Sequence, residues 1–436
     1  MIKFTKVKIL WNNLFRFSEP EKVLSAVFKS SFINFFARIF GYLKNFIIAI
    51  LLGFSYQTDG FFMAISLIGI FLIFVDVFDS IGVPNLVKAK LRSQEDFNRL
   101  SGLLFTFTTI LAFLGSILAF TFIPLILKIP IGFKENAISY TKVSYVFLIP
   151  YLFFSFYFHH FGAILRSQRL FTPYFIGEFL CSFFSFLFIL IGLYLYRDYK
   201  VLPISLSLAQ ALATFYMFYV GREHIKFNFF LDNDTKLTLK QFFYLIGVYG
   251  VFHLYLLVDK AFASLLGEKN VSALHYGLML AMAPKNIVKF EHIAITSLSE
   301  VKGSLEKLNF YIKRLMLLGL IFSLLLFIFS ELFVALFFGH GAFTKIDISL
   351  TSKATRFYAL SISFAFLWPV FYRVFQIKNR LKPIFFVAIG GVIANFIANY
   401  IFVIVLSLDI AGVCFGTFFA YGILCSLSYY FLKKGS

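Results

Sequence analysis

Apolar runs of about twenty residues follow one another along the whole sequence, and this pattern restricts the chain to few folds. Of the 436 residues, 60% are hydrophobic and only 14% are charged. A soluble globule cannot cover its surface with so few charges. The runs lack the two-residue alternation of barrel strands, whereas a helix satisfies its own backbone groups in lipid. The sequence therefore predicts an all-α polytopic membrane protein.

The runs are bounded by charged or turn residues and predict twelve transmembrane helices in two halves. The longest polar connection, 221–239, has six runs before it and six after it. It is therefore predicted to be a linker between two lobes, 23–220 and 240–436. The tripeptide Leu-Leu-Gly ends the first run at 51–53 and recurs at 265–267, as in a duplicated chain. Two six-helix lobes of this kind hold a site between them near the middle of the membrane. The predicted runs are 23–53, 60–84, 101–127, 138–163, 170–196, 200–220, 240–266, 271–298, 307–337, 351–376, 382–407 and 409–432.

Lysine and arginine are distributed unequally between the two sides of this topology. The side that carries the N-terminus holds 24 of the 40 basic residues and the opposite loops hold 6. This bias predicts that both termini are cytoplasmic, with 1–22 as an amphipathic lead-in on the cytoplasmic face. It also accounts for the net charge of +19 without nucleic acid, so we expect membrane lipids rather than nucleic acid as partners.

Enzyme signatures are hard to find in the sequence. It has no GxxxxGK[ST] phosphate loop, no HExxH and no Cys/His spacing suited to zinc. Cys181, Cys414 and Cys425 fall inside predicted spans, and we interpret them as small packing residues. Asp76 and Asp79 share a helical face and could act as paired acids, but the external loops are too short for a membrane glycosyltransferase domain. These observations favour a transporter over an enzyme.

Cations inside the apolar runs are the strongest functional signal. Arg38 and Lys44 lie within the first run, although a cation at the centre of a membrane helix costs roughly 2.5–3.5 kcal/mol on insertion scales. We expect them to face a cavity, although Lys44 could also snorkel to the headgroups. Asn34 shares a helical face with Arg38, and Lys285 is a third candidate cavity cation. Such a set suits an anionic substrate with an apolar part.

A second candidate site consists of oxygen ligands in the other half. Asn395 and Asn399 are four residues apart, so their side chains project from one helical face. Together with Asp259 they could form a cage for a small cation. Hydrogen bonding between helices is an equally good interpretation of the two asparagines.

The stretch 37–64 resembles the first helix and following loop of the MurJ/MviN flippases, whose pattern is S-R-x-x-G-x-x-R-D, then F-G, then T-D-x-F-F-x-A. Residues 341–344 are similar to the family's G-x-F-T, and 272–284 to its eighth helix. The resemblance implies the fold of the multidrug/oligosaccharidyl-lipid/polysaccharide exporter superfamily and transport of lipid II, the undecaprenyl-diphosphate-linked precursor of peptidoglycan, across the inner membrane. It also implies a substrate-binding role for Asp59. By the same resemblance, a sodium ion would bind Asp259, Asn395 and Asn399, with Thr417 as a looser candidate.

The sequence departs from the family pattern at several cavity positions. Lys44 and Asn45 replace a second arginine and its neighbouring acid, while Leu72 and Met279 stand where two further arginines are usual. Some members also have two additional helices. We therefore expect a polyprenyl-diphosphate-linked sugar as the substrate, either lipid II or another envelope precursor of the polysaccharide or O-antigen type. A drug or metabolite antiporter of the same superfamily is the alternative from another substrate class.

Overall fold

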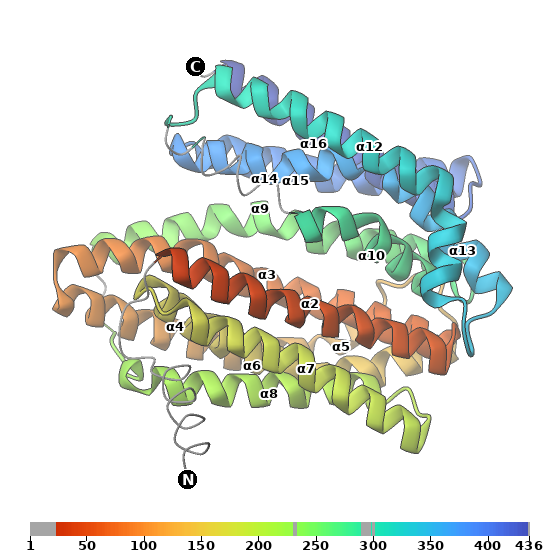
Figure 1. Ribbon diagram of the computed structural model, residues 1–436, viewed down its shortest axis with the longest axis horizontal. Helices are drawn as coiled ribbons and strands as arrows, with labels where there is room; N and C mark the ends of the chain where they lie inside the picture. The colour runs from red at the N-terminus through yellow and green to blue at the C-terminus, as the bar shows by residue number, and fades with distance from the viewer. Residues whose placement is uncertain (1–22, 230–232, 289–297, 299–300, 435–436) are drawn as a thin grey trace, which may run out of the picture. The chain divides into compact units, whose positions relative to one another are not determined.

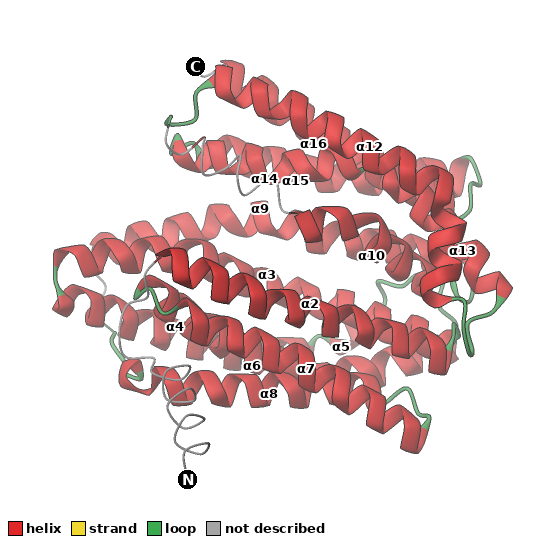
Figure 2. Cartoon of the chain, viewed as in Figure 1, coloured by secondary structure: helices red, strands yellow, loops and turns green. Residues whose placement is uncertain are grey.

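The computed structural model describes residues 23–229, 233–288, 298 and 301–434, and every regular element in these ranges is a helix (Figures 1 and 2). The all-helical prediction is confirmed for this part of the chain. The helices are α2 (Val23–Leu52), α3 (Tyr56–Arg92), α4 (Gln94–Thr121), α5 (Ile123–Ile126), α6 (Glu135–Ser167), α7 (Phe171–Tyr196), α8 (Val201–Gly221), α9 (Asn233–Ala263), α10 (Asn270–Val288), α12 (Leu305–Phe338), α13 (Lys345–Ala359), α14 (Ile362–Ile377), α15 (Leu381–Asn399) and α16 (Ile410–Lys434). Short 3₁₀ turns follow α8 (Arg222–His224) and α9 (Ser264–Leu266), and a π-helical turn follows α15 (Tyr400–Val405).

The number of spans is close to the predicted twelve. Within the described residues, 10 helices are long and apolar enough to cross a membrane, and the bent pair α13 and α14 raises the number to 11. The predicted eighth span, 271–298, corresponds to α10, which covers Asn270–Val288, while 289–297 lie outside the described residues. The lead-in 1–22 also lies outside them.

The predicted tenth span, 351–376, consists of two helices, α13 and α14, that meet at an angle of 49°. The amide of Leu360 donates to the oxygen of Phe357, and the amide of Ser361 donates to the oxygen of Tyr358. These are tight i to i+3 bonds, and the Ser361 hydroxyl also donates to Tyr358 O at 2.7 Å. The Ser361 hydroxyl thus competes for a backbone carbonyl that would otherwise accept only a backbone N–H of the α-helix. The helix therefore bends here without a proline.

The chain divides into two compact units that each collect several segments. One consists of 1–45, 74–120 and 147–239, and the other of 46–73, 121–146 and 240–436. The predicted linker 221–239 includes the start of α9 at Asn233. The boundaries of the two predicted lobes stay a prediction.

Aromatic packing builds the first unit. Helices α7 and α8 lie side by side (Figure 1). The ring of Phe40 on α2 packs against three rings of α7, with centroids 5.1–5.8 Å apart. This contact sets α2 against α7. The α7 rings are those of Phe179, Phe183 and Phe186.

In the second unit, α15 packs on α16, and α13 packs on α10, α12 and α16. Its interior holds several fully buried large side chains. These contacts bring one face of α15 and α16 to the end of α13, where the second site described below is found. The buried side chains include Tyr276, Phe338, Tyr358, Phe366 and Phe375.

The two halves of the sequence repeat one another in their backbone. Gly53 and Gly267, the last residues of the two Leu-Leu-Gly tripeptides, both have positive φ, at 60° and 96°. Helices α3 and α10 then start three residues later in each half, at Tyr56 and Asn270. Further on, Arg169 in the first half is equivalent to Asn379 in the second, and Arg197 is equivalent to Ser407, at the same separation in sequence. All four residues have φ between 48° and 65°. Such matching turns support a duplicated architecture.

Candidate functional site

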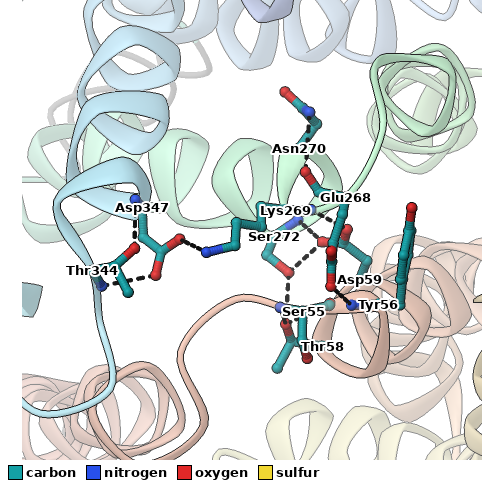
Figure 3. A network of polar contacts seen from close by, with 10 residues as sticks. All are labelled: Ser55, Tyr56, Thr58, Asp59, Glu268, Lys269, Asn270, Ser272, Thr344 and Asp347. Carbon is teal, nitrogen blue, oxygen red and sulfur yellow. Dashed lines mark hydrogen bonds and ion pairs between the residues drawn. The ribbon is translucent and has the colours of Figure 1, made fainter.

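Asp59 binds the N-terminus of a helix from the other half of the sequence. It lies in the first turn of α3 and is fully buried. Its Oδ2 accepts the backbone N–H of Lys269 at 2.6 Å, and its Oδ1 accepts the backbone N–H of Ser272 at 2.8 Å and the Ser272 hydroxyl at 2.6 Å (Figure 3). The first N–H groups of a helix have no partner within it and carry partial positive charge. The Asp59 carboxylate therefore caps α10.

The cap is reciprocated on α3. The backbone N–H of Tyr56, the first residue of α3, donates to Oε1 of Glu268 at 3.0 Å (Figure 3). Each of the two repeat-related helix starts thus receives a carboxylate from the other half. Both helix starts carry partial positive charge and would repel each other. The two carboxylates neutralise these partial charges.

A buried acid connects α13 to the same place. The Lys269 ammonium binds Asp347 Oδ1 at 2.9 Å, and the Asp347 side chain is 1% exposed. The other carboxylate oxygen accepts the Thr344 N–H at 2.8 Å, while the Asp347 N–H donates to the Thr344 hydroxyl (Figure 3). This is a capping box at the start of α13. We call these contacts the helix-end clamp, made of Tyr56, Thr58, Asp59, Glu268, Lys269, Ser272, Thr344 and Asp347.

Two loops complete the clamp by docking on helix ends. The Ala342 N–H donates to Ile50 O, a carbonyl in the last turn of α2, at 2.7 Å. In the other half, the Gly132 N–H donates to Ser264 Oγ at 3.0 Å, and Ser264 occupies the position equivalent to Ile50. Gly341 has a φ of 63°, and a Cβ there would collide with Ile50 O. Each half therefore contributes a loop that packs on the helix end of the other.

The structure brings together Asp259 and the three residues expected to surround it. Asp259 Oδ1 accepts the amide N–H groups of Asn395 at 3.2 Å and Asn399 at 3.0 Å. Its Oδ2 accepts the hydroxyls of Thr417 at 2.5 Å and Tyr358 at 2.7 Å. All five residues are buried. Sequence reasoning missed Tyr358, because a tyrosine in an apolar run carries no local signal of a polar role.

The donor set of this cluster fits a small cation. The amide oxygens of Asn395 and Asn399 are buried and have no donor among the described residues. A half-turn of each amide exchanges its nitrogen and oxygen, and would direct two carbonyl oxygens at the Asp259 carboxylate. With the Thr417 hydroxyl, the set would then be entirely oxygen, which hard cations prefer. The π-helical turn that begins at Tyr400, directly after Asn399, is a feature often found at functional sites.

The predicted cations of α2 lie in the first unit. Arg38, Lys44 and Asn34 are all half-buried. The Arg38 Nε is buried without an acceptor, and neither cation forms an ion pair with another residue in the described ranges. Lys285 is half-buried on α10 in the second unit, as part of a different group of helices. Arg38 and Lys44 could therefore both bind an anion.

These features define a class: a polytopic helical membrane transporter with two repeated halves. Comparison with known proteins gives the family. Residues 48–436 match the family described as lipid II flippase MurJ, and the chain belongs to this family.

Relatives and solved structures agree with this assignment. The chain is 25% identical over 385 residues to a probable lipid II flippase MurJ of Aquifex aeolicus, covering 84% of this chain and 76% of that protein. A lipid II flippase MurJ structure in an inward closed conformation superposes with a TM-score of 0.79 at 21% identity, covering 93% and 87% of the two chains. An inward-facing multidrug resistance MATE family transporter of the MOP superfamily gives 0.68 at 14% identity, covering 91% and 94%. The predicted family and MATE-like fold are confirmed.

Proposed function

We propose that this chain is a flippase that moves an undecaprenyl-diphosphate-linked sugar precursor, lipid II or a related envelope intermediate, across the bacterial inner membrane. The observation that carries the proposal is the pair of half-buried cations on α2, Arg38 and Lys44, which have no acidic partner among the described residues. A diphosphate supplies the missing anion. A charge-assisted hydrogen bond contributes about 1.5–3 kcal/mol, so these residues can select a charged headgroup.

The basic character of this region also bears on the alternative substrate class. Exporters of cationic drugs need acids where their substrates bind. Arg38 and Lys44 would repel such a substrate, so we favour the lipid-linked anion over a drug or metabolite antiporter.

The helix-end clamp supplies one gate of the transport cycle. Its contacts join the starts of α3, α10 and α13, which come from both halves of the sequence. While the clamp is formed, this end of the pathway is closed, and breaking it opens the pathway here. The predicted orientation, with both termini in the cytoplasm, places the clamp on the external side. A cysteine at Glu306 should then resist a membrane-impermeant maleimide in intact cells, whereas a cysteine at Asp198 should react; the reverse would contradict the orientation.

Sodium is the proposed ligand of the Asp259 cluster. Asp259, Asn395, Asn399 and Thr417, which come from α9, α15 and α16, would hold the ion. The ion would favour the closed packing of these helices, because it binds residues from all three.

The proposal is tested in cells whose own lipid II flippase is depleted. Expression of this chain should restore growth, and vesicles that contain it should translocate lipid II. The double variant Arg38→Ala/Lys44→Ala at matched membrane levels should do neither. Rescue by the double variant equal to wild type would contradict the proposal. A chain that inserts normally but neither rescues growth nor moves lipid II would shift the substrate to another lipid-linked sugar.

A further inference from the structure

We propose that Lys260 determines which cation the Asp259 site accepts, so that the site takes one monovalent cation and excludes divalent ones. The inference rests on the cation site of the proposed function and assigns a selectivity role to a residue that is not one of its ligands.

Asp259 and Lys260 are neighbours in the last turn of α9, so their side chains point about 100° apart. Asp259 faces α13, α15 and α16 through its four hydrogen bonds. Lys260 faces α3, where its ammonium donates to the backbone oxygen of Phe62 at 2.8 Å and lies 5.9 Å from the centroid of the Phe62 ring. The ammonium is therefore directed at α3, whereas the adjacent Asp259 carboxylate is directed at the four residues of the cation site.

Lys260 is a buried charge without a dedicated counter-ion. Lys260 is only 3% exposed. Its ammonium forms no ion pair within 4.0 Å in the part of the chain that the structure describes. The carboxylates of Asp259 and Asp59 both act on its charge from a greater distance. Asp59 lies one helical turn before Phe62, so Lys260 connects the Asp259 site with the helix-end clamp.

The charges buried around Lys260 do not balance. Counted at their ordinary ionisation near neutral pH, Asp59 and Asp259 contribute two negative charges and Lys260 contributes one positive charge, while the Lys269–Asp347 pair cancels itself. Glu268 is exposed, so water screens it. The buried set therefore has one uncompensated negative charge, which is costly in a low-dielectric interior. One monovalent cation at Asp259 restores neutrality, whereas a divalent cation would leave an excess positive charge beside a fixed ammonium.

A purely structural role for Lys260 makes a different prediction. If the ammonium only ties α9 to the Phe62 carbonyl, its removal lowers stability without changing which ion binds. If it determines the charge of the ion, its removal leaves two negative charges and changes the selectivity for ions.

The experiment measures thermal unfolding of the purified full chain in detergent with sodium, calcium or choline chloride at constant ionic strength. Sodium should stabilise the wild type by mass action, and calcium should not. In Lys260→Met, calcium should stabilise as well, with an apparent affinity at least about tenfold above that for wild type. Lys260→Arg keeps the charge and should respond like wild type. Lys353→Met removes a partly exposed lysine of the same unit, paired with Asp409, and should also respond like wild type.

Lys260→Gln serves as a second neutral variant where the methionine variant fails to fold. The proposal is overturned if sodium and calcium act on the neutral variants as they act on wild type. It is also overturned if calcium stabilises the wild type as strongly as sodium, a result that needs no variant. A wild type that ignores sodium and calcium alike would instead refute the Asp259 cation site, which separates the two failures.

Discussion

The hydroxyl oxygens of Thr58 and Ser272 lie 3.1 Å apart, and the two residues occupy equivalent positions 214 residues apart in the two halves of the sequence. Residues that contact their own repeat equivalents lie on the local two-fold axis of a duplicated structure, as in a symmetric dimer interface. The reciprocal caps on α3 and α10, and the loops that dock on α2 and on the 3₁₀ turn after α9, are arranged around this contact. The clamp is therefore the place where the two repeats meet through matching parts.

The two-fold relationship is broken by one acid, and this gives the first prediction. Asp59 is buried and binds three donors, whereas the equivalent position in the second half is Ala273. In Asp59→Asn, an amide N–H would face backbone N–H groups that need an acceptor. We expect the unfolding free energy to fall by about 2 kcal/mol and the clamp to open more often. A cysteine at Ala273, with the native cysteines replaced, should then react faster with a maleimide.

Asp198→Asn is the matched control for this change. Asp198 also accepts a backbone N–H, from Lys200 at 2.9 Å, but its side chain is 42% exposed. Its substitution should change stability by no more than about 0.5 kcal/mol. Equal effects of the two asparagine variants on stability and labelling would show that the clamp does not depend on the buried acid.

Glycine substitutions test the docked loop. Gly341→Ala combines a left-handed φ of 63° with a collision against Ile50 O, whereas Gly267→Ala has a φ of 96° with open space around its new methyl group. Gly390 has neither problem. Backbone with positive φ costs about 1–3 kcal/mol for an L-residue, and alanine gains up to about 1 kcal/mol over glycine inside a helix.

The unfolding temperature should therefore be lowest for Gly341→Ala, intermediate for Gly267→Ala, and unchanged or raised for Gly390→Ala. If the first two variants are equally stable, the contact between Gly341 and Ile50 does not constrain the loop, and only the backbone conformation matters.

Arg38 is predicted to be the main anchor of the diphosphate. Its guanidinium offers a planar fork, its Nε is buried without an acceptor, and Lys44 offers only a point charge. Native mass spectrometry with a polyprenyl diphosphate should show about ten- to a hundredfold weaker binding in Arg38→Ala, an intermediate effect in Arg38→Lys, and a smaller one in Lys44→Ala. Lys353→Ala is the control for charge.

Two outcomes would contradict this assignment. If Arg38→Ala binds like wild type while Lys44→Ala does not, the anchor is Lys44. If both variants bind and transport fully, the cationic mechanism is wrong.

Local rules were sufficient for part of this picture. The spacing of Asn395 and Asn399 placed both amides on one helical face, and the structure finds both on Asp259. The Leu-Leu-Gly repeat predicted a duplication that the positive φ of Gly53 and Gly267 supports. These features depend on a few neighbouring residues, and so they can be read from a single sequence.

Other contacts could not be predicted because they join distant elements. Nothing near Glu268 or Asp347 shows that one caps α3 and the other binds Lys269. The family resemblance suggested a substrate role for Asp59, which stays a prediction, while its hydrogen bonds with α10 follow only from tertiary packing. The bend at Ser361, which ends α13 just after Tyr358, depends on a hydroxyl that is unremarkable in sequence.

Tyr358 leads to the last prediction, which concerns the cation site. The Tyr358 hydroxyl donates to Asp259 Oδ2 at 2.7 Å and so competes with a cation for that oxygen. Tyr358→Phe should destabilise the sodium-free protein by about 1.5–3 kcal/mol, and should increase the further stabilisation that sodium provides, because the freed carboxylate oxygen can bind the ion. Asn395→Leu removes a ligand oxygen and should abolish the sodium response.

Tyr145→Phe is the matched control, because the Tyr145 hydroxyl is buried but has no hydrogen-bond partner in the described part of the chain. Unfolding temperatures measured against sodium concentration distinguish these cases. If the sodium-dependent shift is the same in Tyr358→Phe, Tyr145→Phe and wild type, the ion does not bind the Asp259 carboxylate, and its four hydrogen bonds serve only to hold α9, α13, α15 and α16 together.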